Sequence, residues 1–346
     1  MMKPKRLLVG LVVVTLLGLG YQVASELTKD YVELNALEKV NGRFHLRDEA
    51  EPYSGKAKYF ADEGWLKQQA TLHQGKLNGE LVSFYETGAI EVVEPYVDGQ
   101  LEGVTRVYLE DGTLNKTIPY HNGLKEGTEA HYGFEGGLLS KSIEYRQGKR
   151  NGWSTSYWDP DRLRNRIHYV DDLRDGLWQQ YSFGKVVIEG PMVKDKEEGE
   201  WRSYFQDTDI LKGIAHFKAG KLHGEVTEFY QNGAKECIEY YDSGNKVGTW
   251  TRFYDDNSPE QVKNYRDNQL DGSYREYHRG GKLAEEGQYQ DGEKVGVWRR
   301  FSPDGRLISV GEEPKAQLEA DSAQNSVPRA QSTEPRARSK EIRRRS

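Results

Sequence analysis

The residues that could support catalysis or metal binding are scattered along this 346-residue chain and follow no catalytic spacing. The eight histidines form no His-x-x-x-His or Glu-x-x-His pair of the kind that holds zinc. The acidic segments 171–175 and 194–200 lack the ligand spacing of a calcium-binding loop. No nucleophile elbow or phosphate-binding loop is present. We therefore expect no catalytic residue, no metal site, no cofactor and no small-molecule substrate.

Aromatic side chains form the more informative pattern, because they return at a fixed period. The stretch VGTWTRFYDDN, residues 247–257, places three aromatic rings around one glycine, so it is either a stacking platform or one unit of a repeat. Intervals of 23 to 25 residues separate eleven glycines, which begin repeats 1 to 11. These glycines, each at position 1 of its repeat, are Gly55, Gly79, Gly103, Gly127, Gly152, Gly176, Gly199, Gly224, Gly248, Gly272 and Gly296.

An aromatic residue stands at position 6 of every repeat, five residues after the glycine. Position 10 is usually glycine, position 12 is usually aliphatic, and position 18 is aromatic in most repeats. Position 3 is tryptophan in several later repeats and smaller in the early ones. The period therefore predicts that Trp250 and Phe253 pack against neighbouring repeats and are not a stacking platform.

Each repeat reads as two short strands joined by a turn, which is a β-hairpin. Positions 6 and 12 are expected to pair across the hairpin, and position 18 to share their face by the two-residue alternation of strands. Position 3 then lies on the other face unless a bulge intervenes. The predicted fold is all-β: an elongated repeat protein whose successive hairpins form an open, single-layer antiparallel β-meander. Residues 55–310 form the eleven repeats, and residues 26–54 a linker with a capping strand near residues 44–46.

The segments GxWxxFYxxG and LxxxxxYxDGxxxG resemble the MORN repeat in its bacterial variant form, found in YwqK-type antitoxin-like proteins. The resemblance extends from about Gly55 to Gly311. It implies a meander of hairpins that mediates interactions without chemistry.

The two ends of the chain differ from the repeats. Residues 1–25 join a basic start to an apolar run and are expected to be either a cleaved signal peptide or an uncleaved signal anchor in the inner membrane. In both cases the repeats would lie outside the cytoplasm, in the periplasm or cell envelope. Residues 311–346 hold no aromatic residue and are expected to be a disordered basic tail, either solvated or attached to an anionic surface.

The net charge of −6 argues against nucleic acid as a partner, and a protein partner of unknown identity is expected instead. The leading hypothesis is an exported or membrane-tethered, non-catalytic interaction scaffold. The alternatives are an antitoxin or immunity protein that sequesters a toxin, and a cell-wall glycan binder. Cys237, the single cysteine, stands at position 14 and is predicted to be a packed, unreactive thiol on the face of positions 6, 12 and 18.

The candidate binding surface consists of aromatic residues that vary between repeats. In a regular strand positions 3 and 7 share a face, so they would form an aromatic strip. The alternative is that these rings cover one another and bind no ligand. The candidates are Tyr85, Trp158, Phe205, Tyr230 and Tyr254 at position 7, with Trp178, Trp201, Trp250 and Trp298 at position 3.

Overall fold

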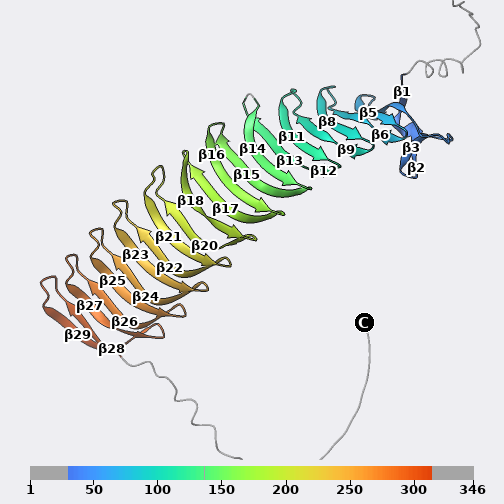
Figure 1. Cartoon of the computed structure of the whole chain (residues 1–346). Helices are drawn as coiled ribbons and strands as arrows, with labels where there is room; N and C mark the ends of the chain where they lie inside the picture. Colours follow the sequence, from blue (N-terminus) through green and yellow to red (C-terminus); the bar gives the residue numbers. More distant parts are fainter. Residues whose placement is uncertain (1–29, 136, 314–346) are drawn as a thin grey trace, which may run out of the picture. The chain divides into compact units, whose positions relative to one another are not determined.

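The computed structural model describes residues 30–135 and 137–313, which are mostly β-strands joined by turns (Figure 1). They divide into two compact units, one ending at Asn245 and one beginning at Lys246. The first unit holds repeats 1 to 8 and the second holds repeats 9 to 11. The predicted export segment, residues 1–25, and residues 314–346 of the predicted tail lie outside the described residues. Residues 311–313 were also predicted to be tail, but they belong to the last strand of the sheet. Within the described ranges, no helix is long and apolar enough to span a membrane.

The first unit contains a short N-terminal region and a long series of strands. Its elements are β1 (Tyr31–Glu33), the 3-10 helix η1 (Leu34–Ala36), β2 (Leu37–Val40), β3 (Arg43–Leu46), β4 (Gly55–Phe60), β5 (Leu66–His73), β6 (Lys76–Leu77), β7 (Gly79–Phe84), β8 (Ile90–Val97), β9 (Gln100–Leu101), β10 (Gly103–Tyr108), β11 (Leu114–His121), β12 (Leu124–Lys125), β13 (Gly127–Phe134), β14 (Leu138–Arg146), β15 (Lys149–Asp159), β16 (Arg162–Val170), β17 (Leu173–Ser182), β18 (Lys185–Val193), β19 (Lys196–Glu197), β20 (Gly199–Tyr204), β21 (Leu211–Lys218), β22 (Lys221–Phe229) and β23 (Lys235–Asp242).

The second unit is built in the same way from six strands. They are β24 (Asn245–Phe253), β25 (Pro259–Arg266), β26 (Gln269–Tyr277), β27 (Leu283–Gln290), β28 (Glu293–Phe301) and β29 (Leu307–Glu313). In both units the strands pair antiparallel with strands near them in sequence, except that β1 pairs in parallel with β4; β2 and β3 form a separate two-stranded sheet. The predicted all-β meander of successive hairpins is therefore confirmed.

The N-terminal cap differs from the prediction. The edge strand β4 is paired by β1, in parallel, with Tyr31 opposite Lys56. Residues 44–46 belong instead to β3, which pairs only with β2 among the described strands. Phe44 and Leu46 pack beside the small core formed by Leu37, Ala57, Ala70 and Leu72. The β2–β3 hairpin thus covers apolar side chains of the sheet, whereas residues 31–33 pair with its first edge strand, β4.

The hairpin register confirms one expectation and corrects another. Position 6 pairs with position 12, as Phe253 does with Pro259. The preceding pair is Arg252 with Gln261, so Glu260 at position 13 is an extra residue, a β-bulge. The bulge reverses the alternation, and position 18 does not share the face of positions 6 and 12. The ring of Tyr265, at position 18, lies 4.6 Å from that of Trp250, at position 3.

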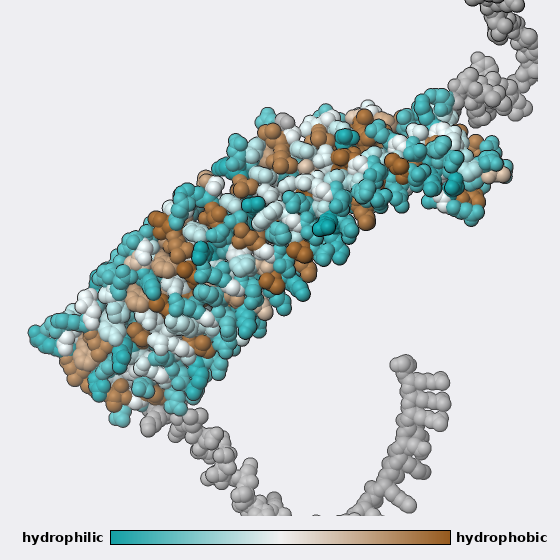
Figure 2. All heavy atoms as spheres, in the orientation of Figure 1, coloured by the Kyte–Doolittle hydropathy of each residue, from teal (hydrophilic) through white to brown (hydrophobic). Residues whose placement is uncertain are grey.

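The face that carries positions 3, 14, 16 and 18, here called the position-3 face, holds most of the buried side chains. Figure 2 shows hydrophobic residues among hydrophilic ones on the visible side of each unit, as a single-layer sheet requires. Its stability must come from side chains of adjacent strands that cover one another. The buried residues of this face include Ala57, Ala70, Leu72, Thr105, Ile118, Glu129, Met192, Trp250, Tyr274 and Trp298.

Candidate partner-binding groove

In some repeats the side chain at position 7 joins its hairpin to the next. The Tyr85 hydroxyl donates a hydrogen bond to the Tyr108 carbonyl at 2.9 Å, and that of Tyr254 donates to the Tyr277 carbonyl at 2.8 Å. In both cases the acceptor is the backbone of position 6 in the following repeat. Position 7 therefore has a structural role, which the sequence pattern does not reveal.

The other position-7 residues follow this arrangement in part. Trp158 Nε1 lies 3.4 Å from the Tyr181 carbonyl, although 52% of Trp158 is exposed. Phe205 and Tyr230 are half-buried. The five aromatic residues at position 7 are thus turn residues of separate hairpins, each packed locally, and they do not form the predicted continuous strip.

Two of the four candidate tryptophans are packed into the sheet. Trp250 is 6% exposed and Trp298 is 5% exposed. A lysine ammonium covers each ring: Lys246 Nζ lies 4.5 Å from the Trp250 ring centre, and Lys294 Nζ lies 3.8 Å from that of Trp298. These rings are not presented to a partner, which corrects their prediction as binding residues.

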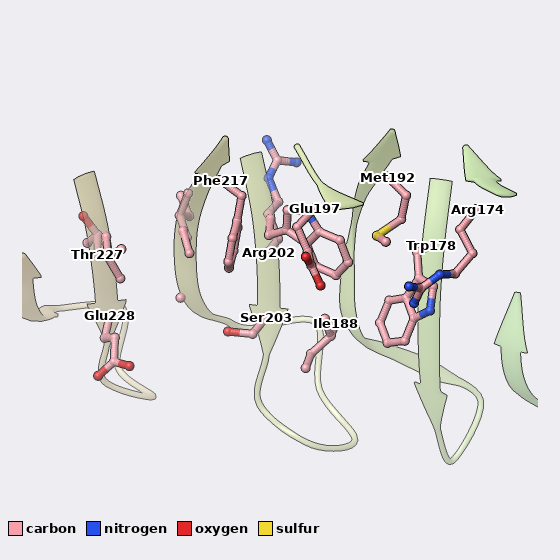
Figure 3. Close-up of a pocket in the computed structure, with 15 residues that line it drawn as sticks. Arg174, Trp178, Ile188, Met192, Glu197, Arg202, Ser203, Phe217, Thr227 and Glu228 are labelled. Atoms are coloured by element: carbon pink, nitrogen blue, oxygen red, sulfur yellow. The ribbon is translucent and has the colours of Figure 1, made fainter. Parts of the chain in front are cut away.

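Trp178 and Trp201 are different, because they are half-buried and line a groove of about 400 Å³ on the position-3 face (Figure 3). Their ring centres are 5.6 Å apart, and the Trp201 ring meets Phe217 edge-on at 6.0 Å. Ile188 and Met192 complete the apolar wall. The two tryptophans were predicted from the repeat pattern, whereas Ile188, Met192 and Phe217, which come from the second strands of hairpins, were not.

The groove exists because no aromatic ring of the described residues covers the small residue Ala215, whereas a tryptophan covers the corresponding glycine elsewhere in the sheet. Trp201 lies over Gly190 so closely that a Cβ at Gly190 would be 2.2 Å from the indole. Trp298 covers Gly287 in the same way, also at 2.2 Å. The corresponding residues of repeats 7 and 8 are Ala215 and Val226, which are cross-strand neighbours. Valine is too small to reach across alanine, so the space beyond Trp201 stays open.

The arginines around the groove have salt-bridge partners, whereas two carboxylates there have none within the described ranges. Arg174 Nε donates to Asp195 at 2.9 Å, and Arg202 Nε donates to Glu200 at 2.7 Å. Glu197 and Glu228 also line the groove. Among the described residues, neither of these two carboxylates lies within salt-bridge distance of a lysine or arginine. The groove therefore presents apolar rings beside two unneutralised carboxylates.

Cys237 lies beside the groove, opposite Glu228 in the register. It therefore shares the position-3 face with position 18 but not with positions 6 and 12, because of the bulge. Burial and the nearby Glu228 carboxylate raise the pKa of the Cys237 thiol to about 12. A thiol with this pKa carries almost no thiolate at neutral pH and is a poor nucleophile.

A buried carboxylate stands at position 3 of repeat 4. Glu129 is 3% exposed and accepts from Lys116 at 3.0 Å, from Lys125 at 2.5 Å and from His131 Nε2 at 2.7 Å. Burial would raise the pKa of Glu129, but these hydrogen bonds outweigh it and lower the pKa to about 2. No group of three or more metal-ligating side chains occurs within residues 30–135 and 137–313. The cluster therefore fills position 3 of repeat 4 with a buried, ion-paired carboxylate.

Hairpins of constant period that pair in sequence order define a β-hairpin repeat protein. Three segments, residues 101–122, 222–242 and 270–291, match the model of the MORN repeat variant. These three segments are therefore MORN repeats of the variant type, and each begins with a leucine two residues before a position-1 glycine.

The chain was also compared with curated proteins and with solved structures. A search of curated proteins finds no match. Among solved structures, the chain is similar to "Crystal Structure of TcdB2-TccC3", with 13% identity and a TM-score of 0.18 over 74% of this chain and 15% of that one. It is also similar to "ASR Alternansucrase in complex with isomaltononaose", with 12% identity and a TM-score of 0.17 over 69% of this chain and 18% of that one. The chain thus spans under a fifth of each.

Proposed function

We propose that the protein is a non-catalytic protein-interaction scaffold and that the groove on repeats 6 to 8 is its binding surface. The observation that carries the proposal is the open aromatic wall of Trp178, Trp201 and Phe217 beside two carboxylates that form no salt bridge among the described residues. Tryptophan, tyrosine and arginine dominate binding energy at protein interfaces when they lie in well-packed, desolvated pockets. A partner that fills the groove would supply that desolvation.

The groove suits recognition more than chemistry. Its two arginines are held in salt bridges, and its apolar wall offers shape and stacking. Rigid presentation on β-strands keeps the entropy cost of binding low, because few side chains must be ordered.

We also propose that the repeats act outside the cytoplasm, either released or tethered by the N-terminal segment. The support is the basic start and apolar run of residues 1–25. A reporter enzyme fused after Val310 tests this. Activity of a reporter that works only outside the cytoplasm is expected, and activity of one that works only inside it would contradict the proposal.

The scaffold role is tested by site-directed photo-cross-linking in the cell envelope. A benzoylphenylalanine at Ser203, inside the groove, is expected to give a discrete protein adduct. The same residue at Val297, exposed on repeat 11, is the matched control and is expected to give none. Equal adduct patterns at both positions, or none at Ser203, would argue against the groove. If the captured protein is a toxin, the role is that of an antitoxin.

A second candidate function is glycan binding, because half-exposed tryptophan rings can stack on sugar faces. Binding of isolated peptidoglycan or cell-wall glycans by the full chain, lost when Trp201 is replaced by Ala, would favour this candidate. Glycan binding that is unchanged when Trp201 is replaced would exclude the groove as the glycan site.

A further inference from the structure

The residue two positions before each position-1 glycine, here called the lead residue, decides how the position-3 ring is covered. It pairs with the second strand of the preceding hairpin, at position 18 or its equivalent. Lys125 lies opposite Tyr120, Glu197 opposite Met192, and Lys294 opposite Tyr289. Because paired residues point to the same side of a sheet, the lead side chain lies on the position-3 face.

Repeats that carry tryptophan at position 3 differ in their lead residue. Repeats 9 and 11 have Lys246 and Lys294, whose ammonium groups stack on Trp250 and Trp298. Repeat 7 has Glu197 instead, beside Trp201 in the groove. Among the described residues, no lysine or arginine is stacked on the Trp201 ring. The ring that repeats 9 and 11 cover with a lysine carries no cation from the described residues here, and a carboxylate takes the place of that lysine. In repeat 6, the lead residue Arg174 is paired with Asp195.

We propose that the groove receives a lysine or arginine side chain from a partner protein, with its cationic group against Trp201 and Glu197 as the counter-charge. The inference rests on the proposed binding role of the groove and specifies the chemistry of its ligand. An aromatic face attracts a cation by about 0.5–2 kcal/mol, with the upper end reached when water is excluded. A carboxylate at hydrogen-bonding distance adds a charge-assisted contact.

The surroundings favour a cation with an apolar stem over an anion. Glu228 provides a second carboxylate at the groove, while Arg174 and Arg202 are already paired with Asp195 and Glu200. Figure 3 shows Trp178, Ile188 and Met192 on one side of Glu197, where the methylene groups of a long side chain can pack. The same features make the groove unfavourable for a phosphate or a carboxylate ligand.

The decisive variant is Glu197→Lys, which gives repeat 7 the lead residue of repeats 9 and 11. Its lysine is expected to cover Trp201 from within the chain, so the fold should keep its thermal midpoint while the site is blocked. Glu110→Lys, on an exposed turn of repeat 3, makes the same charge change away from the groove and is the control.

Binding is measured by calorimetry with the full chain and a capped Gly-Leu-Lys-Leu-Gly peptide. We expect the acetyl-lysine form of the peptide, and the Glu197→Lys variant, each to weaken binding by at least about tenfold, with Glu110→Lys unchanged. Equal binding of the acetylated peptide, or full binding by Glu197→Lys, would overturn the proposal. Binding of n-butylammonium as tight as the peptide would overturn a peptide partner in favour of a free cation.

Two further results separate the alternatives. If the peptide binds only after residues 329–346 are deleted, the occupant is the chain's own basic tail, and the proposal of a partner fails. If Glu197→Lys still forms the Ser203 cross-link in the envelope, the scaffold role stands and only the cation site is overturned.

Discussion

Repeat 11 and the pair of repeats 7 and 8 show how one frame gives either a closed or an open surface. In repeat 11, Trp298 covers Gly287 and is itself covered by Lys294. In repeat 7, Trp201 covers Gly190, but its lead residue is Glu197 and the following repeat offers Val226 in place of a ring. The surface is closed where a ring covers the glycine of the preceding hairpin and a lysine covers that ring. It is open beyond Trp201, where Glu197 replaces the lysine and Val226 replaces the next ring.

This difference indicates that an open groove in a hairpin repeat does not need an inserted loop or an additional domain. A change of a few side chains on the position-3 face is enough, because a single-layer sheet has no second layer to fill the space. Each repeat therefore contributes its own share of stability and its own share of exposed surface.

The largest expected effect comes from removing the ring in the closed region. Trp298→Ala should lower the local free energy of unfolding by about 3–5 kcal/mol, because a buried ring is lost above a glycine that cannot fill the space. Trp201→Ala should cost about half as much, since that ring is only half-buried. Amide hydrogen exchange of the flanking strands measures both. Equal losses at the two sites would remove the distinction between closed and open regions.

The next comparison is with repeat 4, which has the charged residue Glu129 at position 3 where repeats 7 and 11 have tryptophan. Glu129→Gln should cost about 2–3 kcal/mol, because it leaves Lys116 and Lys125 beside an uncharged group in a mostly buried site. Glu110→Gln, on an exposed turn, is the control and should change stability little. Denaturant unfolding followed by exchange within repeat 4 measures both, and a neutral Glu129→Gln would mean that the ion pairs contribute nothing.

The same cluster predicts an acid dependence. The folded pKa of Glu129 is about 2, below its ordinary value of 4.5, so its stabilising contribution is present above about pH 4.5 and is lost as the pH falls towards 2. The wild-type chain should lose stability across this window, and Glu129→Gln should lose less. If the stability of the two proteins falls in parallel with decreasing pH, an ionised Glu129 carboxylate does not stabilise the fold.

A smaller effect is expected at position 7. Tyr254→Phe removes the hydroxyl that bonds to the Tyr277 carbonyl but keeps the ring, so it should cost about 1 kcal/mol. Thermal melts of this variant and of Tyr59→Phe, at an exposed tyrosine of position 5, provide the comparison. If both variants melt with the wild type, the hydrogen bond between repeats has no energetic role.

The smallest expected effect concerns Cys237, and it is a change in the reaction rate of its thiol, not in the stability of the protein. With a pKa of about 12, its thiol should react with a maleimide much more slowly than free cysteine at pH 8, and faster as the pH rises. The unfolded chain should react at the ordinary rate. Rapid labelling of the folded protein would contradict the packed position beside Glu228.

Much of this arrangement follows from sequence alone, because period and turn residues act locally. The eleven hairpins, the pairing of positions 6 and 12, and the left-handed turn residue at position 10, such as Asn257 with φ 66°, were all predictable. The bulge at position 13 was not, because Lys67, Glu91 and Glu260 carry no signal for an extra residue. Without the bulge, position 18 was assigned to the wrong face.

The groove was less predictable for the same reason. Its walls come from strands whose facing sides are fixed by the bulge, so Ile188, Met192 and Phe217 could not be assigned to one surface. The exchange of lysine for Glu197 is visible in the sequence, but it has meaning only once the lead residue is known to lie beside the position-3 ring.

The most direct test of this account is the double variant Ala215→Gly and Val226→Trp, which gives repeats 7 and 8 the glycine and ring of repeats 10 and 11. The new indole should lie over residue 215 as Trp298 lies over Gly287, closing the groove. The account predicts a thermal midpoint at or above that of the wild type, together with loss of the Ser203 cross-link to the envelope partner. A folded double variant that still captures the partner through Ser203 would contradict it.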